Sequence, residues 1–254
     1  MSRFIFIIAH KYIRGHDSYV KYSVDQINKL YPDSLILVVD NNSKYFDDIS
    51  TKLESYKNVR LLENKLESKF ECGAYLCGIF YLFQNSIKCD YIFFLQDTMI
   101  PKNAYLPRSS VLSVLSNNIT QEIANMAPLT VGIIDDYLNM LHQEPFNFNI
   151  EKSCACSSFV LQYDKLEKLS NYLSKIVVKT REESIAMEFV LGRLLYLLND
   201  KKYSDIDGPW EGVICDRPDG SRSYNCFDVD PYKEDHPYYF LKKIQNKTER
   251  TVDH

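Results

Sequence analysis

Polar and acidic residues follow each of four apolar runs in the first hundred residues. They are Ala9-His10, Asp40-Asn41-Asn42-Ser43, Glu63-Asn64 and Gln96-Asp97-Thr98. In an open α/β sheet, ligands bind beyond the carboxyl ends of the strands, where loops and helix N-termini present unpaired N–H groups. If the four apolar runs are neighbouring strands, these residues are expected to form one polar binding site.

No glycine-rich phosphate loop accompanies these strand ends. The sequence has no G-x-G-x-x-G after the first run and no G-x-x-x-x-G-K-[S/T] anywhere. This argues against a dinucleotide-binding protein and against a P-loop protein. A diphosphate at this edge would most simply be held by a divalent cation, Mn²⁺ or Mg²⁺, on a carboxylate together with a few hydrogen-bond donors.

The elements that would position these residues alternate regularly. Continuous apolar runs at 3–9, 35–39, 58–62 and 90–95 are typical of strands that are covered on both faces. Helices are expected at 17–30, after the second run as far as about residue 56, and at 71–83. Four successive β–α units predict an α/β fold with a mostly parallel central sheet and helices on both faces.

The second half of the chain is less regular. The patterns predict a loop and helix within 101–116, a short strand at 122–127 and an irregular insertion at 129–150. A strand at 157–162, a helix at 165–177, an amphipathic helix at 183–198 and a strand at 213–215 follow. No repeat, low-complexity tract or linker interrupts the sequence, which predicts a single domain over 1–254.

Composition excludes several classes of partner. The net charge of −4 lacks the basic excess that nucleic-acid binding requires. The first apolar run is too short for a secretory signal, and no apolar run reaches the length of a transmembrane helix. The seven cysteines form no C-x-x-C pair, which favours free thiols in a reducing compartment. We therefore expect a cytoplasmic protein; the sequence predicts no oligomeric state.

Three segments resemble segments of GT-A glycosyltransferases and follow one another along the chain in the order found in that family. Val38–Ser43 is similar to the second-strand signature of family-2-like enzymes, whose aspartate contacts the nucleoside. Phe70–Tyr75, followed by Gly78, resembles a segment of rhamnan- and capsule-type transferases. Tyr91–Thr98 stands where those enzymes keep Asp-x-Asp. The resemblance implies a GT-A (Rossmann-like) domain that binds a nucleotide-sugar donor through residues 1–100 and a glycan acceptor through residues 101–254.

The resemblance also implies roles for individual residues around the donor. Asp97 would ligate Mn²⁺ or Mg²⁺. His236 would be a second ligand from the C-terminal tail, and the alternative for it is a surface histidine of that tail. One acidic residue stands where Asp-x-Asp has two, and the alternative for Asp97 is an aspartate that caps a turn. The residues expected to line the nucleotide site are His10, Asp40, Asn42, Glu71, Gly73 and Gln96. Turn formation is the alternative for Asp40, and a helix start is the alternative for Glu71.

A catalytic base and an acceptor platform are implied in the second half. Met187–Leu194 resembles a late helix of the family, which makes Glu188 the candidate base, with Glu182 and Glu183 as substitutes. The alternative is a solvated glutamate that favours the helix start. Trp210 and Glu211 would contact the acceptor, although a lone Trp can equally anchor a core.

The expected function is transfer of a sugar, with a UDP-sugar favoured as donor, to a glycan or other hydroxyl acceptor, with inversion and a divalent metal. Two alternatives remain open. An Asp-x-Asp motif that keeps only one of its two acidic residues is compatible with an inactive GT-A-fold binding or scaffold protein. Lys11 and Arg14, after the first strand, are compatible with a related nucleotidyltransferase.

Overall fold

The computed structural model describes residues 3–11, 18–43, 46–107, 111–116, 128–148 and 150–202, together with short strands at 215–216, 222–223 and 240–242. A six-stranded sheet in the order β3-β2-β1-β4-β7-β6 organises these residues. Its strands are β1 (Phe4–His10), β2 (Leu35–Asp40), β3 (Val59–Glu63), β4 (Tyr91–Gln96), β6 (Val111–Ser116) and β7 (Ser153–Gln162).

The first four strands run parallel, and β7 is antiparallel to both β4 and β6. All seven residues of β1 are buried, because this strand lies inside the sheet and helices cover both of its faces. The predicted α/β class, with a mostly parallel sheet between helices, is confirmed.

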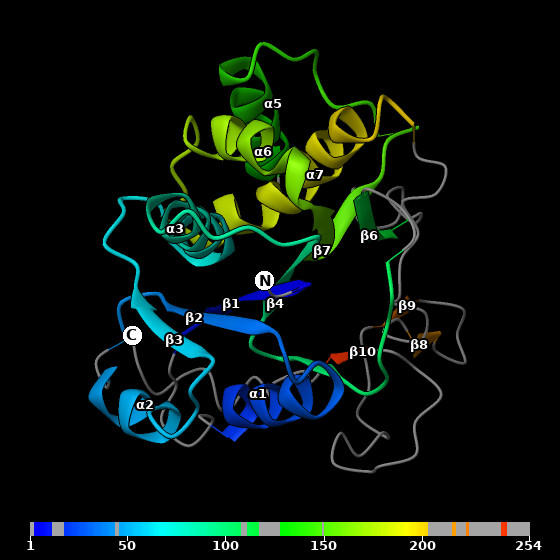
Figure 1. The fold of residues 1–254 in the computed structure, drawn as a ribbon. Coiled ribbons are helices and arrows are strands. Elements are labelled where there is room, and N and C mark those ends of the chain that lie inside the picture. Colours follow the sequence, from blue (N-terminus) through cyan, green and yellow to red (C-terminus); the bar gives the residue numbers. More distant parts are fainter. Residues whose placement is uncertain are drawn as a thin grey trace.

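Helices form a layer on each face of the sheet (Figure 1). One layer consists of α1 (Ser18–Leu30) and α2 (Phe46–Leu53). The other consists of α3 (Phe70–Gln84), α5 (Pro128–Met140), α6 (Leu166–Leu173) and α7 (Arg181–Leu198). Each layer has its own apolar core, with stacked rings of Phe6 and Phe93 in the first and of Phe94 and Phe159 in the second.

Local sequence explains where several helices begin and end. Helix α1 ends one residue before Tyr31-Pro32, because proline disfavours a helical conformation in the residue before it. Helix α7 begins with a capping box, in which Thr180 and Glu183 each satisfy a backbone N–H of the other. Helix α3 is apolar on nearly all sides, as expected for a helix enclosed by the sheet, α6 and α7.

Smaller elements complete the described chain. A 3₁₀ turn at Tyr163–Lys165 (η1) leads into α6. β5 (Met99–Pro101) pairs antiparallel with β10 (Phe240–Lys242), and β8 (Cys215–Asp216) pairs antiparallel with β9 (Arg222–Ser223). No helix in the described ranges has the length and apolarity needed to cross a bilayer.

Two sequence-based expectations for the second half are wrong. Residues 111–116, expected within a loop and helix, form β6, because β7 provides a pairing partner that local sequence does not reveal. Residues 129–150, expected to be irregular, contain most of α5. Ile134, Tyr137, Leu138 and Leu141 recur at helical spacing and are buried, and α5 packs on α7. The expected strand at 122–127 lies outside the described residues, as do positions 213 and 214.

The structure describes the side chains of four cysteines, and these four are free thiols. Cys72, Cys89 and Cys154 are buried, and Cys77 is half-buried. Burial raises the pKa of Cys72 to about 11 and that of Cys89 to about 12. The expectation of free thiols is therefore confirmed for these four.

Candidate functional site

The site lies where the strand order changes direction. The chain builds the sheet from β1 through β2 to β3 on one side, and then places β4 on the other side of β1. Open α/β sheets bind ligands at such a switch point, outside the carboxyl ends of the two strands. In the pairing register, His10 is opposite Asp40, and Ala9 is opposite Gln96, the residue before Asp97.

His10, Asp40 and Asp97 therefore stand in a row across three adjacent strand ends, here called the acid–imidazole row. Side chains alternate between the faces of a strand. Because Ile8, Val38 and Leu95 belong to the core beneath α1 and α2, the alternation places the row on that same face.

His10 and Asp97 are directly bonded. The His10 Nδ1 lies 2.8 Å from Asp97 Oδ2, and His10 is only 3% exposed. Since a carboxylate only accepts, Nδ1 carries the proton of this bond. The Lys11 backbone N–H donates to the same oxygen at 3.5 Å. His10 Nε2 is buried without a hydrogen-bond partner among the described residues. The imidazole thus fixes the orientation of Asp97 at the switch point.

Asp40 has the contacts of a turn residue. It is fully buried, and its carboxylate accepts from the Ser43 N–H at 2.7 Å and from the Ser43 hydroxyl. Asn42, in the same turn, is exposed and has φ of 61°, a left-handed conformation that asparagine tolerates. The turn role that sequence offered for Asp40 is present, and nucleotide contacts of Asp40 and Asn42 stay predictions.

A second polar group lies on the face covered by α3 and α7. Glu71 Oε1 accepts from Gln96 Nε2 at 2.7 Å, and Glu71 Oε2 accepts from the Ser184 hydroxyl at 3.1 Å. The Gln96 N–H donates to Ser158 Oγ at 3.4 Å. These four residues, called the Glu71 cluster, join α3, β4, β7 and α7 at the carboxyl end of β4.

Gly73 is a packing residue in the described structure. A Cβ at this position would lie 1.9 Å from the carbonyl oxygen of Ser68 and 2.6 Å from Asn64 Nδ2. Asn64 is buried and holds this loop, since its amide donates to Asn41 Oδ1 and to the Ser68 carbonyl, each at 2.9 Å. Gly73 thus allows α3 to start directly against the loop, and its contact with a donor stays a prediction.

Glu188 lies half-buried on α7, one turn after Ser184. Two substitutes for Glu188 were suggested. Glu183 caps the helix start, because its carboxylate accepts hydrogen bonds from the N–H groups of Lys179 and Thr180 at 2.6 and 2.8 Å. Glu182 is exposed. Of the three glutamates, Glu188 is the one that lies on the same face of α7 as Ser184, a member of the Glu71 cluster, because residues four apart are neighbours on a helix.

Four other expected residues lie outside the described chain. They are Arg14, Trp210, Glu211 and His236.

The donor set at the switch point fits a divalent cation only in part. In the ranges that the structure covers, no three His, Cys, Asp or Glu side chains gather as ligands. Among the residues that the structure describes, the two hydrogen bonds of the Asp97 carboxylate both use Oδ2. Asp97 can therefore contribute Oδ1 to a cation whose other ligands are phosphate oxygens and water, an arrangement that Mg²⁺ commonly adopts.

Sequence reasoning did not single out Ser158 or Ser184, and it placed Ser43 among the strand-end residues without giving it a role of its own. Ser158 and Ser184 each had a weak signal: Ser158 is a polar residue within an apolar strand, and Ser184 precedes Glu188 by one helical turn. The roles of Ser43, Ser158 and Ser184 depend on partners 3, 62 and 113 residues away, respectively.

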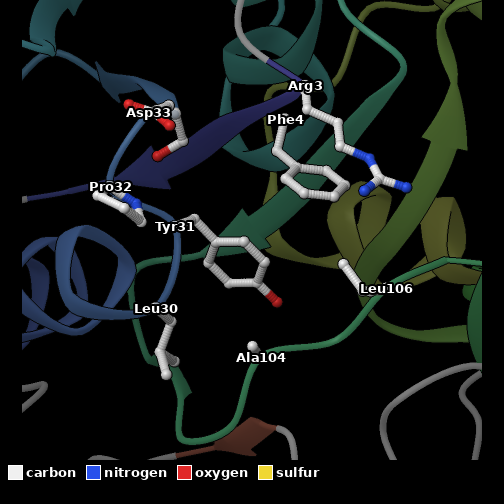
Figure 2. Close-up of a pocket in the computed structure, with 9 residues that line it drawn as sticks. Arg3, Phe4, Leu30, Tyr31, Pro32, Asp33, Ala104 and Leu106 are labelled. Carbon is white, nitrogen blue, oxygen red and sulfur yellow. The ribbon is translucent and has the colours of Figure 1, made fainter.

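A hollow of about 220 Å³ lies at the opposite end of the sheet. Figure 2 shows the rings of Phe4 and Tyr31 and the side chains of Leu30 and Leu106 around it, with Arg3 alongside. Phe4 begins β1 and His10 ends it, so this hollow is roughly 20 Å from the switch point.

Comparison with known proteins gives distant structural similarity. No protein-family model matches the chain, and no curated protein matches it. Among solved structures, it is similar to the bifunctional glycosyltransferase WbbM in its apo form, at 15% identity and a TM-score of 0.45 over 83% of this chain and 39% of WbbM.

Two further similar structures are glycosyltransferases. The mannosyltransferase PcManGT from Pyrobaculum calidifontis, solved with GDP-Man and Mn²⁺, is 11% identical, with a TM-score of 0.40 over 66% of this chain and 46% of that one. The galactosyltransferase LgtC, solved with donor and acceptor sugar analogues, is 10% identical, with a TM-score of 0.36 over 73% and 70%. At these values the likeness decides neither family nor activity, so the function proposed below rests on residues of this chain.

Proposed function

We propose that this protein is a glycosyltransferase of the GT-A type, which transfers a sugar from a nucleotide-sugar donor to a hydroxyl acceptor. The observation that carries the proposal is the His10–Asp97 pair at the switch point, 2.8 Å apart, beside the Glu71 cluster. A carboxylate held in place at the carboxyl ends of β1 and β4, without a glycine-rich phosphate loop, is suited to a diphosphate that a cation bridges.

The donor's diphosphate would lie outside β1 and β4, with Asp97 as the protein ligand of Mn²⁺ or Mg²⁺. When bound, such a cation neutralises charge on the leaving diphosphate. His10 orients Asp97, and Gln96 is fixed beside it by Glu71. We favour a UDP-sugar as donor and a glycan or other hydroxyl as acceptor, with His236 as a further ligand and Trp210 and Glu211 on the acceptor side.

Glu188 would act as the base of an inverting reaction. The acceptor oxygen attacks the anomeric carbon, its proton passes to the Glu188 carboxylate, and the nucleoside diphosphate leaves with the electrons of the broken C–O bond. The placement of Glu188 one turn beyond Ser184, which bonds to Glu71, supports this role.

Nucleotide binding is the first test. The melting temperature is measured with UDP, GDP or dTDP, each with and without Mn²⁺, because a ligand that binds only the folded state stabilises it. We expect one nucleotide to raise the melting temperature, more strongly with Mn²⁺, and Asp97→Ala to abolish the increase. Asp90→Ala is the matched control, since Asp90 is an exposed carboxylate at the other end of β4. Absence of any increase in the wild type would refute the proposal.

Turnover is the second test. Hydrolysis of UDP-, GDP- and dTDP-sugars identifies the donor, and Glu188→Gln is then assayed for binding and transfer. We expect the variant to keep the nucleotide-induced stabilisation and to lose transfer by ~10²-fold or more, as is typical of a lost general base. Full turnover by the variant would exclude Glu188 as the base.

A non-catalytic binding protein is the second candidate, because a single carboxylate is found where Asp-x-Asp has two. It predicts nucleotide stabilisation without turnover of any sugar donor in the same screen.

A further inference from the structure

Three elements that are distant in sequence meet at one carboxylate. Glu71, in the first turn of α3, bonds to Gln96 at the end of β4 and to Ser184 in the first turn of α7, partners 25 and 113 residues away. We propose that Glu71 is a positioning residue, which holds the end of β4 and the start of α7 in one arrangement, rather than a residue that contacts the donor. This inference rests on the proposed function, because Asp97 and Glu188 are the residues being positioned.

Two hydrogen bonds link the segment before α3 to the segment before α7 and bring the two helix starts together. The Lys69 N–H donates to the Val178 carbonyl at 2.6 Å, and the Val178 N–H donates to Ser68 Oγ at 3.1 Å. Outside this link, Lys179 and Glu67 form an exposed ion pair. The link brings the segment before α3 beside the segment before α7, and the Glu71 bonds then connect the helices themselves.

The bond to Gln96 fixes the orientation of an amide. A carboxylate accepts hydrogen bonds and donates none, so the amide nitrogen of Gln96, and not its oxygen, must face Glu71. The 2.7 Å distance is typical of a charge-assisted bond, roughly twice as strong as a neutral one. Gln96 is followed directly by Asp97, so Glu71 restrains the strand end on one face while His10 restrains it on the other.

The bond to Ser184 restrains the start of α7. Ser184 and Glu188 are four residues apart and lie on the same face of the helix. A hydroxyl held by Glu71 therefore limits rotation and fraying of the turn that leads to Glu188. Misplacement of a catalytic group by about 1 Å can cost ~10²-fold in rate. Loss of the bond between Ser184 and Glu71 is therefore expected to affect turnover much more than donor binding.

Glu71→Gln is the central test, because it keeps the shape of the side chain and removes its charge. Hydrogen exchange of the backbone amides in 181–188 is measured together with nucleotide stabilisation and the kcat and KM of the donor found by the screen. We expect faster exchange in 181–188, a kcat lowered by about 10- to 100-fold and a donor KM changed by less than about threefold.

Ser184 provides the second pair of variants. Ser184→Ala removes one link of Glu71 and is expected to change exchange and kcat in the same direction as Glu71→Gln. Ser184→Thr retains a hydroxyl and is expected to restore both. Glu67→Gln is the matched control, since it removes an exposed carboxylate of the same loop and should change neither quantity.

The outcomes separate this proposal from the function on which it rests. Unchanged exchange in 181–188 in both Glu71→Gln and Ser184→Ala would overturn the positioning role. Loss of nucleotide stabilisation in Glu71→Gln, with unchanged kcat at saturating donor, would show a direct donor contact instead and also overturn it. If the wild type binds no nucleotide, the glycosyltransferase proposal fails, and the exchange measurement still tests the connection between Glu71 and α7.

Discussion

At the scale of single residues, two buried side-chain atoms have no hydrogen-bond partner among the described residues. They are His10 Nε2 at the switch point and Ser34 Oγ at the other end of the sheet. His10→Phe should abolish most of the nucleotide–Mn²⁺ stabilisation, because Asp97 loses the bond that orients it. Ser34→Ala should leave that stabilisation intact and raise the free energy of unfolding by about 1 kcal/mol, since it removes an unsatisfied hydroxyl. Thermal shift and urea unfolding measure both; equal nucleotide shifts in His10→Phe and wild type would contradict the orienting role.

At the scale of elements, the start of α3 depends on the absence of one side chain. Gly73→Ala should lower the free energy of unfolding by at least 1–3 kcal/mol, because its Cβ would meet the Ser68 carbonyl oxygen at 1.9 Å and that atom belongs to the backbone. Gly132→Ala in α5 is the matched control. Its Cβ would meet nothing within 4 Å, so about 0.5–1 kcal/mol of stabilisation is expected from helix propensity. Urea unfolding compares the two, and equal effects would contradict this account of Gly73.

The elements also show how far sequence reasoning reached. The four parallel strands were predictable because each is a continuous apolar run with polar residues at its end, and these ends placed His10, Gln96 and Asp97 near one another. β6 was not predictable, because its pairing with β7 joins residues that are 37 (Ser116 and Ser153) to 50 (Val111 and Leu161) positions apart in the sequence. The Glu71 cluster was missed as a unit for the same reason: nothing near Ser184 in the sequence indicates that its partner is Glu71.

At the scale of the whole molecule, buried thiols predict how stability depends on pH. Burial raises the pKa of Cys72 to about 11 and that of Cys89 to about 12, from 9.0 for an unburied thiol. Above pH 9 the unfolded chain therefore binds fewer protons than the folded one, so stability falls as pH rises. The free energy of unfolding should decrease from pH 9 to pH 11, and the decrease should be smaller in Cys72→Ala/Cys89→Ala. Urea unfolding at several pH values measures this; parallel curves for the two proteins would contradict it.

The bond between Glu71 and Ser184 also has a consequence for how the protein is made. Its partners are separated by 113 residues, whereas the parallel strands β1 to β4 are all contained in the first 96. Closing a long loop is slow, and the N-terminal part of a chain leaves the ribosome first. The acid–imidazole row can therefore form while the second half of the chain is still being synthesised. The Glu71 cluster has to wait for α7, so the complete site is expected to be among the last features that the folding chain acquires.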